Sequence, residues 1–166
     1  TFAPPAAAAT LPADALAQAA ALLNGARRPA IIAGGGARGA APQLRELIER
    51  LDGYLATTAA GKGVLPEAHR CNLGASLPYG ATQQLLRQSD VVLAVGTQIT
   101  ETDIYTSHRL PLEGRLLRID IDAERNDLYP AAVSLRGDAR QVLAALLPQV
   151  TARTGWRAAA EIGRAH

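Results

Sequence analysis

The sequence contains few of the residues that stabilise small secreted domains or bind metals. It has a single cysteine, Cys71, and no methionine. One cysteine excludes an internal disulfide and a cysteine-based zinc site, and it fits a reducing, cytoplasmic location. We expect Cys71 to be a loop residue without a catalytic role, because a catalytic thiol needs a nearby base. His69, His108 and His166 are too far apart for a metal motif, and we expect each to lie on the surface.

Aromatic residues and long apolar runs are also scarce. Aromatics make up 4% of the chain and the formal net charge is only +2, whereas nucleic-acid binding usually needs a basic surface with aromatics between the charges. No apolar run approaches the roughly 20 residues of a membrane span. The N-terminus has neither the basic start nor the apolar stretch of a signal peptide. These features argue against nucleic-acid and membrane partners.

Lysine occurs once, at Lys62, although the chain has 17 basic residues. It lies in the stretch 57-TTAAGKG-63. A lysine there can meet a ligand phosphate as a point charge, remain solvated, or pair with a neighbouring subunit.

The 166 residues, 48% of them apolar, suit one domain with a sizeable core. Residues 1–11 are rich in alanine and proline and are typical of a linker. The run VVLAV at 91–95 has no polar alternation, which indicates a parallel strand covered on both faces. Alternation of strands and helices predicts a doubly wound α/β sheet. The expected strands are 29–33, 54–57, 91–95, 116–121 and 133–135, and the expected helices are 12–23, 41–51, 79–88 and 138–147, with loops at 59–76 and 96–114.

Glycines follow the first expected strand in the order Gly34, Gly35, Gly36 and Gly39. They meet a G-x-G-x-x-G spacing that lets backbone amides approach a phosphate at a helix N-terminus. The same residues also fit a tight strand-to-helix turn without a ligand. Thr57-Thr58 occupies the place where a typical NAD site has an acidic residue for the ribose, which argues against an ordinary dehydrogenase.

Polar residues follow the other strands. Thr97 and Gln98 offer neutral hydrogen bonds, and we expect the acidic residues Glu101 and Asp103 to lie on a solvated loop. Asp120 is placed to bind a ribose diol. Asp122 is expected to cap a short helical turn near 123–125, and Asp138 to cap the last helix.

Six segments in order resemble the central domain of thiamine diphosphate-dependent enzymes, over about residues 12–148. They are RPAIIAGGGA, ATTAAGKG, NLGAS, SDVVLAVGTQ, RLLRIDID and LRGDARQVL. That family includes acetolactate synthase, pyruvate oxidase, oxalyl-CoA decarboxylase and other 2-oxoacid decarboxylases. The resemblance implies a Rossmann-like three-layer sandwich of the DHS-like NAD/FAD-binding type, with a six-stranded, mostly parallel sheet. The loop GTQITETD resembles decarboxylase-like members, including those acting on guanidino-2-oxoacids.

The resemblance also implies that thiamine diphosphate and Mg²⁺ belong to N- and C-terminal domains of a longer parent, a homo-oligomer (dimer or tetramer). The last domain of that family carries a GDG…N motif, which Gly137-Asp138-Ala139 does not match. We therefore expect no catalysis by this chain alone, and expect residues 149–166 to lead toward the next domain. In different members the central domain holds FAD, ADP or coenzyme A, or nothing.

The resemblance implies, position by position, that a dinucleotide would contact fourteen residues: Gly34, Gly35, Gly36, Thr58, Ala59, Gly74, Ser76, Gly96, Thr97, Gln98, Asp120, Ile121, Asp138 and Ala139. Acetolactate synthases have arginine at the position of Gln98 and histidine at that of Ser76. Loss of the arginine removes a charge-assisted contact to FAD phosphates, worth about 1.5–3 kcal/mol. FAD, ADP and an empty crevice in a purely structural domain remain open. The alternative from another class is a stand-alone NAD(P)-binding module.

Overall fold

The computed structural model describes residues 11–99, 109–122, 128–153 and 156–157. Within them the helical elements are α1 (Ala13–Gly25), the 3-10 helix η1 (Gly35–Ala40), α2 (Ala41–Leu51), α3 (Gly80–Gln88), α5 (Ala139–Leu146) and the 3-10 helix η2 (Leu147–Gln149). The strands are β1 (Pro29–Ala33), β2 (Tyr54–Thr57), β3 (Asn72–Gly74), β4 (Val91–Val95), β5 (Arg115–Asp120) and β6 (Val133–Arg136).

The described strands form one parallel sheet in the order β3-β2-β1-β4-β5-β6. Every residue of β1 and β4 is buried, as the uninterrupted apolar runs predict. In register, Ile31 of β1 lies between Leu55 of β2 and Leu93 of β4. From β1 the chain builds the sheet outward to β2 and β3, and it then returns to place β4, β5 and β6 on the other side of β1. The order of strands in the sheet therefore reverses between β1 and β4. The predicted Rossmann-like fold with a parallel sheet is confirmed.

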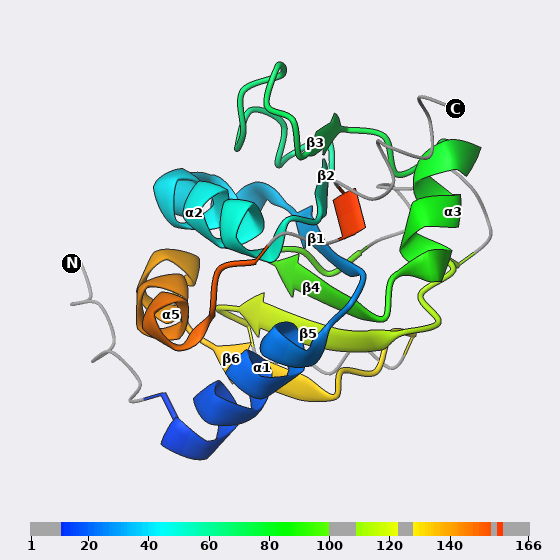
Figure 1. Cartoon of the computed structure of the whole chain (residues 1–166). Coiled ribbons are helices and arrows are strands. Elements are labelled where there is room, and N and C mark those ends of the chain that lie inside the picture. The colour runs from blue at the N-terminus through cyan, green and yellow to red at the C-terminus, as the bar shows by residue number, and fades with distance from the viewer. Residues whose placement is uncertain (1–10, 100–108, 123–127, 154–155, 158–166) are drawn as a thin grey trace.

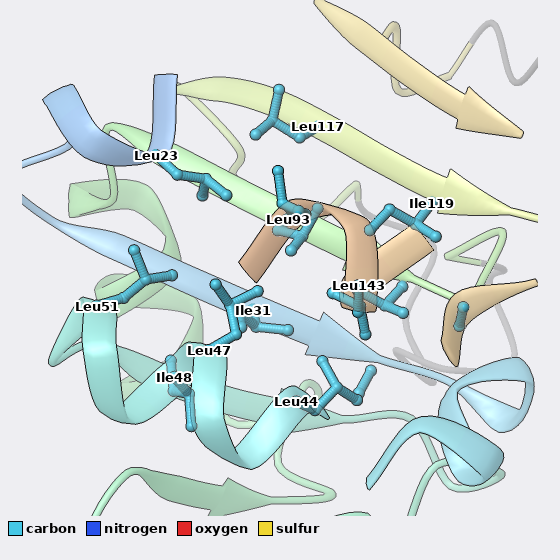
Figure 2. Packing of buried hydrophobic residues seen from close by; sticks show 14 of the residues in the cluster. Leu23, Ile31, Leu44, Leu47, Ile48, Leu51, Leu93, Leu117, Ile119 and Leu143 are labelled. Carbon is cyan, nitrogen blue, oxygen red and sulfur yellow. The ribbon is translucent and has the colours of Figure 1, made fainter. Parts of the chain in front are cut away.

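Helices cover both faces of the sheet (Figure 1). On one face α1, α2 and α5 pack over the main hydrophobic core, and Figure 2 shows Leu47 of α2 and Leu143 of α5 directed toward Ile31 and Leu93. On the other face Leu86 of α3 belongs to a smaller cluster. The periodic leucines of each helix make an apolar stripe that is buried against the strands.

Several expectations about single elements need correction. Residues 72–74, expected within a loop, form β3, a short and half-exposed edge strand that pairs with β2. In α3, Leu86 points into the core and is 1% exposed, whereas the neighbouring Leu85 is only half-buried. β5 begins and ends one residue earlier than predicted, and β6 ends one residue later.

The side chain of His69 is buried, contrary to the expectation that it lies on the surface, whereas Cys71 lies in a loop as expected and is buried there. The His69 side chain is 7% exposed, and its Nε2 lies 2.8 Å from Glu49 Oε1. The Cys71 amide donates to His69 Nδ1 at 3.2 Å, and burial raises the pKa of the Cys71 thiol. His108 and His166 lie outside the described residues, as do Glu101, Asp103 and the turn that Asp122 was expected to cap.

The segment after η2, residues 150–153 and 156–157, is here called the exit strap. Asn24 at the end of α1 holds the beginning of the strap by two hydrogen bonds. The Nδ2 of Asn24 donates to the Gln149 carbonyl at 2.8 Å, and the Oδ1 of Asn24 accepts from the Thr151 amide at 2.9 Å. Arg50 Nη1 donates to the Val150 carbonyl at 3.0 Å. The beginning of the strap therefore packs against the C-terminal ends of α1 and α2.

The end of the exit strap is held by a buried ion pair. Arg157 Nε lies 2.8 Å from Asp52 Oδ1, and the two side chains are 7% and 5% exposed. Trp156 meets Tyr54 edge to face, with ring centroids 5.2 Å apart. Figure 1 shows the strap in orange and red, passing from α5 toward β2. The strap is thus part of the folded domain.

Candidate functional site

The carboxyl ends of β1, β4, β5 and β6 surround a hollow of about 170 Å³, here called the crevice. Its position beside the point where the strand order reverses is the usual ligand position in open α/β sheets. Its lining consists of Gly36, Gly96, Ile119, Asp120, Ile121, Gly137, Asp138 and Ala139. The structure therefore gathers six of the fourteen predicted contact residues around one hollow.

The glycine corner after β1 packs tightly against the corner after β4. A Cβ on Gly34 would lie 2.4 Å from the Gly96 carbonyl oxygen, and one on Gly96 would lie 2.5 Å from the Ala37 nitrogen. Gly96 also has a φ of 62°, in the left-handed region. The Gly36 amide donates to the Gly96 carbonyl at 3.1 Å. Gly34 and Gly36 therefore act as a close-packed turn, and the Gly36 amide is already engaged within the protein.

The side chains around the crevice are acidic. Asp138 is the N-cap of α5, as predicted, and its Oδ2 accepts from the Gln141 amide at 3.2 Å. Asp120 accepts from the Asp122 amide at 2.9 Å and from Gln98 Nε2 at 3.2 Å. Among the described residues that line the crevice there are two carboxylates and no basic side chain. Such a lining suits hydroxyl and amino donors of a nucleoside better than phosphate oxygens.

Arg118 is a residue that the sequence interpretation missed. It is 6% exposed in the middle of β5, and burial lowers its pKa against the opposing effect of the Asp120 charge. Its Nη1 donates to Gln98 Oε1 at 3.2 Å, and its Nη2 donates to the Tyr129 carbonyl at 3.4 Å. Gln98 is consequently held between a guanidinium and a carboxylate. The signal was present in RLLRID, where an arginine interrupts an otherwise apolar, doubly covered strand.

Other predicted contact residues are engaged away from the crevice. Thr58 Oγ1 accepts from the Gly61 amide at 3.2 Å, and Thr97 Oγ1 accepts from the Ile99 amide at 3.0 Å. Ser76 Oγ lies 2.7 Å from Thr82 Oγ1. Gly74 lines a different hollow, and Gly35 and Ala59 are absent from the crevice lining. The three hydroxyls are thus hydrogen-bonded within the protein, and a ligand role for all six residues stays a prediction.

The described residues contain neither a cluster of metal ligands nor a membrane-spanning helix. Within the described ranges, His, Cys, Asp and Glu side chains nowhere gather in a group of three that could hold a metal ion. None of the described helices is both long and apolar enough to cross a bilayer.

Comparison with known proteins gives consistent matches. The family model for the central domain of thiamine pyrophosphate enzymes matches residues 16–146. A probable 2-ketoarginine decarboxylase, AruI, of Pseudomonas aeruginosa is 49% identical over 154 residues, which are 91% of this chain and 27% of that protein. The large subunit of acetolactate synthase isozyme 1 of Escherichia coli is 30% identical over 143 residues, 84% of this chain and 25% of its own length.

A solved structure shares the fold. An enzyme from Mycobacterium smegmatis, assigned as thiamin diphosphate-dependent, superposes with a TM-score of 0.73 at 24% identity, covering 92% of this chain and 30% of that one. The chain thus spans about a quarter of the length of the curated relatives described above.

Proposed function

Because the chain belongs to the family of central domains of thiamine pyrophosphate enzymes, we propose that it is the central domain of a longer 2-oxoacid decarboxylase acting on a guanidino-2-oxoacid. The observation that carries the proposal is the 49% identity to a probable 2-ketoarginine decarboxylase over nearly the whole chain. The acetolactate synthase relative is more distant, at 30%.

In this proposal the chain is a scaffold. Thiamine diphosphate, with Mg²⁺, is held by the other domains of the parent, a cytoplasmic homo-oligomer, and supplies the electron sink for decarboxylation. The residues of this chain set the position of those domains. The exit strap supports that role, since the Asp52–Arg157 pair and the Tyr54–Trp156 contact fix residues 156–157 beside the beginning of β2.

We further propose that the crevice takes the nucleoside end of an adenine nucleotide, ADP or FAD. The lining supports this part of the ligand: Asp120 is an acceptor for ribose hydroxyls, and Gly36 and Gly96 bound the hollow with backbone alone. The diphosphate does not fit between Asp120 and Asp138, because both are carboxylates. It would lie outside this lining.

The proposed parent activity is tested on a purified longer protein containing this sequence. We expect kcat/KM for 5-guanidino-2-oxopentanoate to exceed that for pyruvate by about 100-fold or more, since a site built to pair with a guanidinium discriminates strongly against a substrate without one. A preference for pyruvate, or a gene with no downstream GDG…N segment, would contradict the proposal.

The proposed nucleotide site is tested by calorimetry with ADP, FAD and NAD on this chain. We expect ADP to bind, and Asp120→Asn to weaken binding about tenfold because a charged acceptor for the ribose is lost. Asp14→Asn, on the exposed first turn of α1, is the matched control. Tight NAD binding without ADP or FAD binding would favour the stand-alone module, and no binding at all would favour a purely structural domain. A yellow or colourless full-length preparation distinguishes FAD from ADP.

A further inference from the structure

A second hollow lies at the edge of the sheet formed by β2 and β3, and it is larger than the crevice, at about 380 Å³. It is lined by Thr57, Lys62, Gly63, Leu65, Glu67, Asn72, Leu73, Gly74 and Ala75, and is here called the edge pocket. No residue of this lining belongs to the crevice. We propose that the edge pocket binds a small zwitterion, a molecule of amino-acid size with one anionic and one cationic group.

Two opposite charges line the edge pocket. Lys62 and Glu67 are both exposed, and neither side chain has an ion-pair partner among the residues that the structure describes. The ammonium of Lys62 suits a carboxylate, and the carboxylate of Glu67 suits an ammonium or guanidinium. A ligand that carries both charges satisfies both residues, whereas an ion of one sign meets one attraction and one repulsion.

A third polar residue of the lining also lacks a partner. Thr57 is 2% exposed, and its Oγ1 has no hydrogen-bond partner in the described part of the chain. Most buried hydroxyls are hydrogen-bonded, so such an exception calls for an explanation. Because Thr57 lines the pocket, rotation about χ1 exchanges its methyl and hydroxyl groups and presents the hydroxyl to a ligand.

The walls of the edge pocket are fixed before any ligand arrives. Asn72 Nδ2 donates to the Pro66 carbonyl at 3.1 Å, and its Oδ1 accepts from the Gly74 amide at 2.8 Å. This side chain ties the loop after β2 to β3, which project together from one edge of the sheet in Figure 1. Gly63 and Gly74 have φ of 92° and 69°, and a Cβ on either would meet open space. Backbone without side chains therefore bounds part of the hollow.

The size and apolar lining of the pocket agree with a short ligand. Its volume is near the lower end of the range for small-molecule sites, about 300–1,000 Å³. Leu65 and Leu73 supply apolar wall between the polar groups. A ligand with charged ends and a short methylene stem matches this arrangement.

Binding is tested on this 166-residue chain, folded as judged by circular dichroism, with ω-amino acids as probes. Glycine, 4-aminobutanoate and 6-aminohexanoate vary the separation of the two charges, and butanoate and butylammonium carry one charge each. We expect one ω-amino acid to bind in calorimetry and to bind about tenfold more tightly than either single-charge analogue. Failure of all three to bind, or equal binding of the single-charge analogues, would overturn the proposal.

Substitutions of the lining residues test whether the ω-amino acid binds in the edge pocket. Lys62→Gln and Glu67→Gln should each weaken the bound ω-amino acid about tenfold, and Glu113→Gln, an exposed carboxylate on another loop, should leave its affinity unchanged. Thr57→Val should also weaken binding without lowering the thermal midpoint of the ligand-free chain, because no bond of the hydroxyl is lost. Undiminished binding in Lys62→Gln and Glu67→Gln, or a lower midpoint in Thr57→Val, would refute the assignment.

Discussion

At the scale of single residues, the buried ion pair of Asp52 and Arg157 offers a direct test of the exit strap. Asp52 has a φ of 50°, a conformation that asparagine tolerates well. We predict that Asp52→Asn lowers the free energy of unfolding by about 3–5 kcal/mol, because the Arg157 guanidinium loses its counter-charge in a buried place. Urea unfolding measures the change.

The matched control for that variant is Glu46→Gln, which removes the exposed i,i+4 partner of Arg50. Exposed pairs of this kind contribute about 0.3–0.5 kcal/mol. Equal losses in the two variants would show that the strap is not held by its ion pair.

We predict that the Cys71 thiol reacts slowly with thiol reagents in the folded protein. Its pKa is raised by burial, so the reactive thiolate is disfavoured in the folded chain. At pH 8 we expect reaction with Ellman's reagent to be at least about 100-fold slower in the native protein than in guanidinium chloride. Because the folded pKa is raised, the stability due to the buried thiol should be lost as pH increases through that pKa. A native rate equal to that of a free thiol would contradict the buried position.

Glu49 gives a prediction for acid pH. Its pKa lies below the ordinary value of 4.5 because its carboxylate is hydrogen-bonded by His69 and then by Arg45. A depressed carboxylate pKa contributes stability that is present above the unfolded value and is lost as pH falls through the folded value. Glu49→Gln should therefore flatten the fall in the thermal midpoint below pH 4.5. An unchanged acid slope would mean that these hydrogen bonds do not persist in solution.

At the scale of elements, the contact between the two glycine corners joins β1 to β4. We predict that Gly96→Ala lowers the free energy of unfolding by about 2–4 kcal/mol, since the new Cβ clashes with backbone atoms of Gly36 and Ala37 at a φ of 62°. The control is Gly25→Ala at the end of α1, where a Cβ meets nothing within 4 Å. That change should be neutral or stabilising by up to about 1 kcal/mol.

The elements that the sequence predicted well are those with a strong local pattern. PAIIA and VVLAV are continuous apolar runs bounded by turn residues, and the leucines of α2 recur at helical spacing. β3 has no such pattern, because its three residues are half-exposed at an edge and depend on pairing with β2. The packing of the exit strap could not be predicted for a similar reason, because the strap is hydrogen-bonded by Asn24 and Asp52, which are more than 100 residues away in the sequence.

At the scale of the whole molecule, burial should set the order in which backbone amides exchange. β1 and β4 lie in the middle of the sheet and are buried throughout, whereas β3 is a three-residue edge strand. Hydrogen exchange followed by NMR should therefore be slowest in β1 and β4 and fastest in β3 among the strands. Faster exchange in β4 than in β3 would contradict the assigned strand order.

The position of the candidate site in the fold could be predicted from the sequence, but the contacts of its residues could not. Ligand positions follow from topology, so residues after β1, β4, β5 and β6 could be assigned to one edge of the sheet from sequence alone. The partners of those residues could not. Whether the Gly36 amide is free, or whether a guanidinium from β5 reaches Gln98, depends on approaches of about 3 Å between segments distant in sequence.

The exit strap is fastened where the strands begin, and the crevice opens where they finish. In the proposed parent enzyme, substitutions in the crevice would therefore leave the contacts of the exit strap intact. Under that proposal, the ligand of the crevice could be gained, exchanged or lost during evolution without a change in how the domain is joined to the rest of the enzyme.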